Sequence, residues 1–177
     1  MSSNATGRLS GIVTEIDPQS IENPVLRFLR DYWEAKRGGR AMPSRADIRP
    51  SEMKEHLGWV ILVDVLPDSA DFRYRMVGSR VSQYFLADST GKTVSEAFAD
   101  YGPEAIGGVQ AVHRKCARDR VVLRSHGGAG WLGRSFLDFD TIYLPLSEDG
   151  ETVNMILSAF TFDQAELIKS RGAGTSA

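Results

Sequence analysis

The chain has a single cysteine, Cys116, among its 177 residues. One cysteine cannot form an internal disulfide, which excludes the disulfide frameworks of small secreted domains and suits a reducing compartment. No apolar run approaches the roughly 18 residues that a membrane span needs. The opening residues, MSSNATGRLSG, lack the basic-then-apolar order of a secretory signal. The sequence therefore predicts a cytoplasmic protein without a membrane span.

The chain also lacks an excess of charge of either sign. Lys and Arg number 21, Asp and Glu 23, and the formal net charge is −2. Without a basic excess to neutralise phosphates, we expect no binding to nucleic acid. The hydrophobic fraction of 42% and the charged fraction of 25% are typical of one globular domain. We predict a flexible N-terminus over 1–19, one domain over 20–163 and a C-terminal tail over 164–177.

The domain is predicted to begin with an amphipathic helix over residues 20–37. Gly38 and Gly39 end this helix, and a linker over 38–57 follows. The linker contains AMPSRADIRPSEM and a stretch, PSEMKEHL, that favours a short helix after Pro50. Arg45 and Arg49 leave two interpretations open. They could form an anion clamp, or they could hold the linker in place through bonds to carboxylates and carbonyl groups.

Five strand-like runs and one long helix follow. GWVILVDVL and DFRYRMVG predict a hairpin, short helices fill residues 80–100, and PEAIGGVQAVHRKCARD predicts a helix over 103–119. RVVLRSH, RSFLDFDTIYLPL and TVNMILSAFTF predict three more strands. This order indicates an α+β domain with a five-stranded antiparallel sheet. The run WVILVDVL does not alternate, so both of its faces need cover, which the N-terminal helix of the same or a partner chain could supply.

The combination of these segments resembles the alphaproteobacterial single-domain PAS family. The resemblance rests on DYWEAKRGG, MPSRADIRPSEMKEHLG, FRYRMVGSRV and YLPLSEDGETVNMIL, and it spans roughly residues 20–163. It implies a PAS fold with helices on one face of the sheet and an accessory N-terminal helix. It further implies a sensory or adaptor module without catalysis, whose output passes to a separate signalling protein.

A PAS-like core implies a region between the sheet and the helices that is either filled or hollow. If it is hollow, a small apolar ligand could occupy it. His113 and Cys116 are three residues apart on the apolar face of the long helix, so both are predicted to point inward. The predicted ligand-lining residues are Tyr74, Met76, Tyr84, Phe85, Phe98, His113, Cys116 and Tyr143. The competing interpretation is that these side chains simply fill the core.

We expect no cofactor and no metal. A structural zinc site needs four ligands, whereas His113 and Cys116 supply two, and neither His56 nor His126 has supporting spacing. The alternative that the resemblance implies is a haem sensor, because a histidine on the corresponding helix ligates iron in haem-binding PAS domains. A buried His113 that is hydrogen-bonded within the core is the simpler interpretation.

A small enzyme with a cone-shaped α+β fold is the third alternative. Asp138 and Asp140 share one face of a predicted strand, which could suggest a pair of acid and base carboxylates. Alternating aspartates on an exposed face explain the pattern equally simply. GAGWLGRS (128–135) has the spacing of a phosphate-binding loop, but a strand-like run follows it where such a loop needs a helix. We therefore predict no catalytic residues.

The apolar stripe of the N-terminal helix predicts a homodimer. It is too apolar to face water, and a two-fold dimer is the commonest way for identical chains to bury such a surface. The predicted interface residues are Ile21, Val25, Leu29, Tyr32 and Trp33.

Overall fold

The computed structural model describes residues 13–15, 20–84, 87, 89–129 and 137–163. Their strands form one antiparallel sheet in the order β1-β4-β5-β6-β2-β3. The strands are β1 (Val13–Glu15), β2 (Val60–Val65), β3 (Phe72–Val77), β4 (Leu123–Gly128), β5 (Asp138–Ser147) and β6 (Val153–Asp163). The five predicted strands and the α+β class are confirmed. A sixth strand, β1, pairs with β4 and lies inside the stretch 1–19 that was predicted to be flexible.

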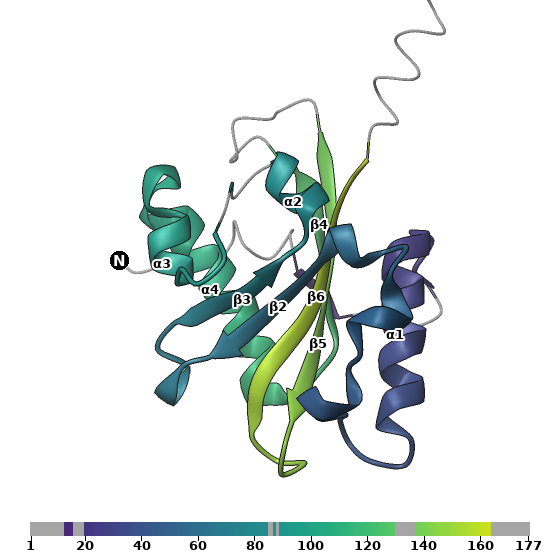
Figure 1. Cartoon of the computed structure of the whole chain (residues 1–177). Helices are drawn as coiled ribbons and strands as arrows, with labels where there is room; N and C mark the ends of the chain where they lie inside the picture. The colour runs from purple at the N-terminus through teal and green to yellow at the C-terminus, as the bar shows by residue number, and fades with distance from the viewer. Residues whose placement is uncertain (1–12, 16–19, 85–86, 88, 130–136, 164–177) are drawn as a thin grey trace, which may run out of the picture.

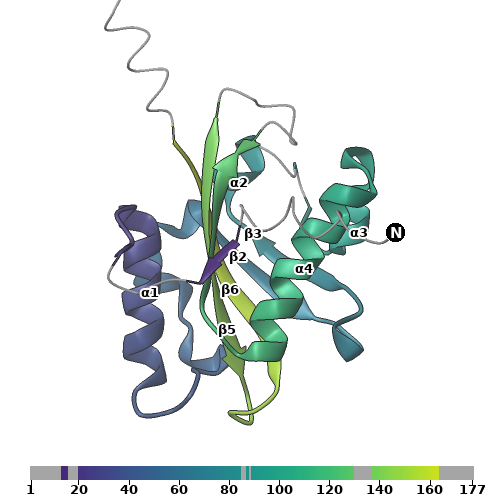
Figure 2. The same cartoon turned by 180° about the vertical axis from the view of Figure 1, so that it is seen from behind.

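Helices cover both faces of this sheet, as Figures 1 and 2 show. One helix lies alone on one side, and the others lie on the opposite side. In chain order they are α1 (Pro24–Arg37), α2 (Ser79–Tyr84), α3 (Val94–Ala97) and α4 (Pro103–Asp119). No helix in the described part of the chain is long and apolar enough to cross a bilayer.

Local chemistry sets both ends of α1. The side chain of Asn23 caps the helix by accepting hydrogen bonds from the amides of Val25 and Leu26 at 3.0 and 3.2 Å. Pro24 occupies the first helical position, where a missing amide hydrogen costs nothing. Gly38 ends the helix with a φ of 56°, in the left-handed region that glycine adopts easily.

The α1 helix packs mainly against β5 and β6 of its own chain, and β2 is the next strand after β6 in the sheet. In α1, Leu26 and Leu29 are completely buried, and Trp33 is 6% exposed. Residues 60–63 of β2 are all buried, on both faces of the sheet. The absence of alternation in β2 agrees with this burial on both faces. The expectation that the N-terminal helix covers β2 is wrong, since α1 contacts mainly β5 and β6.

The short helix predicted after Pro50, in the linker between α1 and β2, forms as a 3₁₀ turn that is shorter than PSEMKEHL. PSEMKEHL does not form an α-helix; it contains a 3₁₀ turn over Pro50–Met53, and a second 3₁₀ turn covers Leu57–Trp59. Buried Met42, Ile48 and Met53 attach the linker to the core. Short 3₁₀ turns suit this anchoring because they change the chain direction every few residues, which a regular helix does not.

Candidate functional site

The inner face of α4 carries His113 and Cys116 into the core, as its periodicity predicted. His113 is 4% exposed and Cys116 is completely buried. The imidazole lies 5.1 Å from the ring of Phe72 on β3 and 5.1 Å from the ring of Tyr143 on β5, measured between ring centroids. His113 therefore connects α4 to two strands of the sheet.

The hydrogen bond of His113 fixes its tautomer. Its Nδ1 atom lies 2.7 Å from the carbonyl oxygen of Val109, one helical turn earlier. A carbonyl oxygen can only accept, so Nδ1 carries the proton and Nε2 keeps a free lone pair. No described residue forms a hydrogen bond to Nε2. Burial lowers the pKa of His113 to about 4, against the opposing effects of Val109 and Asp71, so the ring is neutral at neutral pH.

The buried phenol and thiol groups around His113 are neutral as well. Burial raises the pKa of the Tyr143 phenol, and the nearby Cys116 thiol adds to that shift. Burial likewise raises the pKa of Tyr74 and that of Cys116. These buried groups are therefore uncharged at neutral pH, and the ionised carboxylate of Asp71 lies at the edge of the region, where it acts on both His113 and Tyr74.

Thr141 belongs to the same region, and the sequence reasoning missed it. It is 1% exposed, and its hydroxyl oxygen is an enclosed polar atom without a hydrogen-bond partner among the described residues. Since side chains alternate along a strand, Thr141 shares the α4 side of β5 with Tyr143 and lies opposite Ser125 of β4. The sequence did contain a signal for this position: if Asp138 and Asp140 share one face of the strand, Thr141 must lie on the opposite face.

The predicted ligand-lining residues divide into separate groups. Tyr74, His113, Cys116 and Tyr143 are buried in the region beneath α4. Tyr84 instead stacks on Phe162 and Trp59, with ring centroids 4.7 and 5.8 Å away. Phe98 is buried beside Tyr101, Met76 is only partly buried, and Phe85 lies outside the described residues.

The aspartate pair does not form an acid–base arrangement in the described part of the chain. Arg124 donates two hydrogen bonds to Asp140, both at 2.7 Å, in the forked geometry typical of a structural ion pair. Asp138 is exposed. The pair borders an open groove of about 560 Å³ on the α1 side of the sheet. No three His, Cys, Asp or Glu side chains among the described residues come together as metal ligands would.

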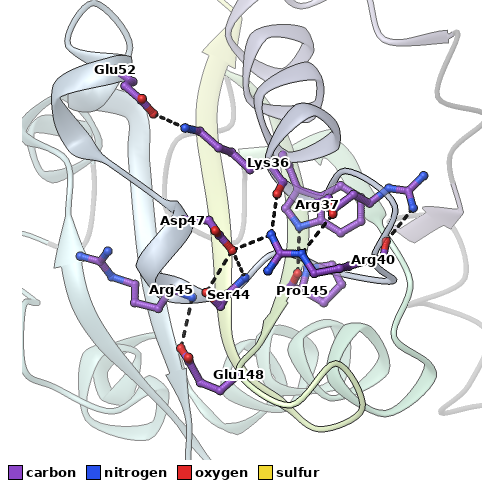
Figure 3. A network of polar contacts seen from close by, with 10 residues as sticks. Lys36, Arg37, Arg40, Ser44, Arg45, Asp47, Glu52, Pro145 and Glu148 are labelled. Atoms are coloured by element: carbon purple, nitrogen blue, oxygen red, sulfur yellow. Dashed lines mark hydrogen bonds and ion pairs between the residues drawn. The ribbon is translucent and has the colours of Figure 1, made fainter.

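The linker forms a polar network with α1 and the β5–β6 hairpin (Figure 3). Asp47 accepts from the amide of Ser44 at 2.7 Å and from the guanidinium of Arg40 at 2.9 Å. The amide of Arg45 donates to Glu148 of the hairpin at 3.2 Å, and its guanidinium donates to the carbonyl of Ile48 at 2.9 Å. Arg45 is thus a structural anchor, as the second interpretation of the linker arginines predicted.

Arg49 takes part through its backbone alone. Its amide donates to the hydroxyl of Tyr32 at 2.9 Å, and that hydroxyl donates to Glu52 at 2.7 Å. Its guanidinium forms no hydrogen bond or ion pair with any described residue. The anchoring interpretation is therefore right for the side chain of Arg45 and wrong for that of Arg49.

The predicted dimer stripe packs mainly against its own chain. Ile21, Leu29 and Trp33 are buried, and the indole of Trp33 donates to the carbonyl of Pro145 at 2.8 Å. Val25 and Tyr32 remain partly exposed. The homodimer stays a prediction, and of the five residues only these two keep exposed surface with which to form it.

The comparisons with known proteins agree with this architecture. The family model described as a PAS domain matches residues 15–161. No curated protein and no solved structure matches the chain.

Proposed function

The chain belongs to the PAS domain family, and on that premise we propose that it is a non-catalytic signalling module gated by a small ligand beneath α4. The family supports a sensory role. The observation that carries the proposal is the enclosed hydroxyl of Thr141, which forms no hydrogen bond of ordinary geometry with a described residue and interacts only with the neighbouring phenol of Tyr143. An unsatisfied buried polar group is destabilising, and native cores retain one where it has a use.

The surroundings of Thr141 define the chemistry of the ligand. His113 offers an acceptor lone pair at Nε2, and the Thr141 hydroxyl can both donate and accept. The rings of Phe72 and Tyr143 supply apolar contact. The only described charge that acts on this region is the carboxylate of Asp71, which would repel an anion. The proposed ligand is therefore small, uncharged and mainly apolar, with one or two hydrogen-bonding groups.

Native mass spectrometry of the protein as purified tests this proposal, together with a thermal-shift screen of small uncharged aromatic and aliphatic compounds. A retained compound, or one that raises the melting temperature of wild type but not of Thr141→Val, supports it. Thr161→Val is the matched control, because Thr161 lies on the opposite side of β6 from this region. A protein without retained compound and without any stabilising compound contradicts it.

Haem is the second candidate, favoured by the free Nε2 of His113. If haem bound there, His113 would hold its iron through Nε2, and the haem would supply a redox-active iron. Phe72 and Tyr143 now pack against the imidazole, so a haem would have to displace them. We propose that the protein binds no haem. An absorption band near 400 nm that disappears in His113→Ala would reverse this ranking.

The proposal also covers the location of the protein, its signalling partner and its oligomeric state. A cytoplasmic, alphaproteobacterial module of this type passes its signal to a separate protein, and a homodimer would form around Val25 and Tyr32. Light scattering at tens of micromolar tests the dimer, with Val25→Asp as the disruptive variant and Glu34→Ala as the control. A monomeric wild type contradicts the dimer and leaves the sensory role standing.

A further inference from the structure

The turn between β2 and β3 has an unusual backbone. Asp68 and Ser69 have φ values of 56° and 52°, so two consecutive residues other than glycine adopt the left-handed conformation. That conformation is unfavourable for residues with a Cβ and persists only where surrounding contacts hold it. Within the turn, the amide of Ser69 donates to Leu66 and that of Ala70 to Pro67, at 3.0 and 3.2 Å.

The contacts that hold this turn come from α4. The guanidinium of Arg114 donates through Nε to the carbonyl of Ser69 at 3.1 Å. One turn earlier on the helix, the amide of Gln110 donates to Asp71 and to Ser95, both at 3.1 Å. The α4 helix thus binds the residues at the end of the strained turn at two successive points.

The same stretch of α4 also contacts the buried region. His113 is adjacent to Arg114 in sequence, and its ring packs on Phe72, which directly follows Asp71. The chain at 69–72 is therefore held by α4 from outside through Arg114 and Gln110 and from inside through His113. Figure 2 shows α4 lying across this side of the sheet. A shift of α4 at His113 cannot leave the bond from Arg114 to Ser69 unchanged, because both belong to one rigid helix.

We propose that the Arg114–Ser69 bond is a latch that holds the β2–β3 turn in its strained form and that opens when α4 moves over its buried region. The latch is the output of the sensor, and it rests on the proposed function in that the ligand supplies the movement. Opening lets Asp68 and Ser69 relax to ordinary backbone angles, and it changes the exposed surface at Pro67, Asp68 and Ala70.

Amide hydrogen exchange by NMR on the ligand-free protein tests the latch directly. Arg114→Met keeps most of the aliphatic stem and removes the donor. We expect the amides of Ser69 and Ala70 to exchange at least about tenfold faster, while those in the middle of β6 are unchanged. Arg118→Met is the matched control, since Arg118 lies one turn further along α4, is exposed, and bonds to no described residue.

A second pair of variants tests the connection to the interior. His113→Phe should alter exchange at Ser69 and Ala70 in the wild-type background, and it should have much less effect when Arg114 is already Met. Tyr143→Phe serves instead if His113→Phe fails to fold. The latch is contradicted if Arg114→Met and Arg118→Met have the same effect on amide exchange at Ser69 and Ala70. It is also contradicted if the effects of His113→Phe and Arg114→Met on that exchange add fully in the double variant. Because no ligand is used, either failure leaves the ligand proposal standing.

Discussion

The two faces of the sheet differ in how their buried polar groups are hydrogen-bonded. On the α1 face, buried apolar side chains are bordered by polar groups that bond to one another, such as Thr161, which accepts from Asn23 and donates to the carbonyl of Asp140 at 3.0 Å each. On the α4 face, the enclosed Thr141 hydroxyl forms no hydrogen bond of ordinary geometry with a described residue, and His113 forms its hydrogen bond through Nδ1. The polar groups described on the first face are satisfied by one another, whereas the second face contains an enclosed hydroxyl that is not.

The largest effect is expected from the first face. Leu29→Ala should lower the free energy of unfolding by about 2–5 kcal/mol, because a completely buried side chain leaves a cavity beneath α1. Urea denaturation followed by circular dichroism measures the change. Glu34→Ala, at an exposed position of the same helix, should change it by less than about 0.5 kcal/mol. Equal losses at both positions would mean that α1 is not seated on the sheet.

The second prediction tests the neutrality of the α4 face. The folded pKa of His113, about 4, lies below its ordinary value of 6.5. The unfolded chain therefore takes up a proton first, so this contribution to stability is complete above pH 6.5 and is lost as the pH falls towards 4. At pH 5 the loss should be on the order of 2 kcal/mol.

His113→Phe should remove that pH dependence, whereas His126→Phe, at an exposed position, should keep it. The measurement is the free energy of unfolding at pH 7 and pH 5 for the three proteins. An identical slope in wild type and His113→Phe would mean that the histidine is hydrated and not buried as described.

The third prediction makes the same substitution on each face. Thr161→Val leaves Asn23 and the carbonyl of Asp140 without their partner, and it should destabilise the protein by about 1–2 kcal/mol. Thr141→Val removes an enclosed hydroxyl whose one described interaction, with the phenol of Tyr143, falls short of ordinary hydrogen-bond geometry, and it should stabilise the ligand-free protein by about 1 kcal/mol. Thermal or urea unfolding of the two variants measures whether each substitution lowers or raises the free energy of unfolding. Destabilisation by both variants would remove the difference between the faces.

The smallest effect is expected in the linker. Arg45→Ala should cost about 0.5–1.5 kcal/mol through its bond to Ile48. Arg49→Ala should cost almost nothing, since only the backbone of Arg49 is engaged. Melting temperatures of the two variants, measured side by side, check this order, and a larger loss for Arg49→Ala would contradict it.

Part of the candidate site was predictable from the sequence. The spacing of His113 and Cys116 placed both on the inner face of α4, and Tyr74 and Tyr143 were predicted to lie in the core, where both are buried. Their meeting could not be predicted, because it depends on which strands pair and in what register. Tyr84 is an example of this limit. It was predicted to lie with the other lining residues, but α2 places it in a separate aromatic stack with Phe162.

The sequence also did not determine which surface covers the apolar stripe of α1. A run of apolar residues at helical spacing requires burial, and its own sheet and a second copy satisfy that requirement equally well. The hydrogen bond from the indole of Trp33 to the carbonyl of Pro145 joins residues 112 positions apart, and no local sequence pattern predicts such a contact.

The sequence by itself determined the elements, because helix and strand periods, caps and turns depend on neighbours within a few residues. Pro103 and the alternation in FRYRMV needed no tertiary information. Only the tertiary structure decided that Gly78 must be glycine, since a Cβ there would lie 2.3 Å from the carbonyl oxygen of Gly58. It also decided that Thr161 finds partners while Thr141 does not. Hydrogen-bond satisfaction in a core depends on which distant segments meet, and that is settled only when the sheet and its two layers of helices pack together.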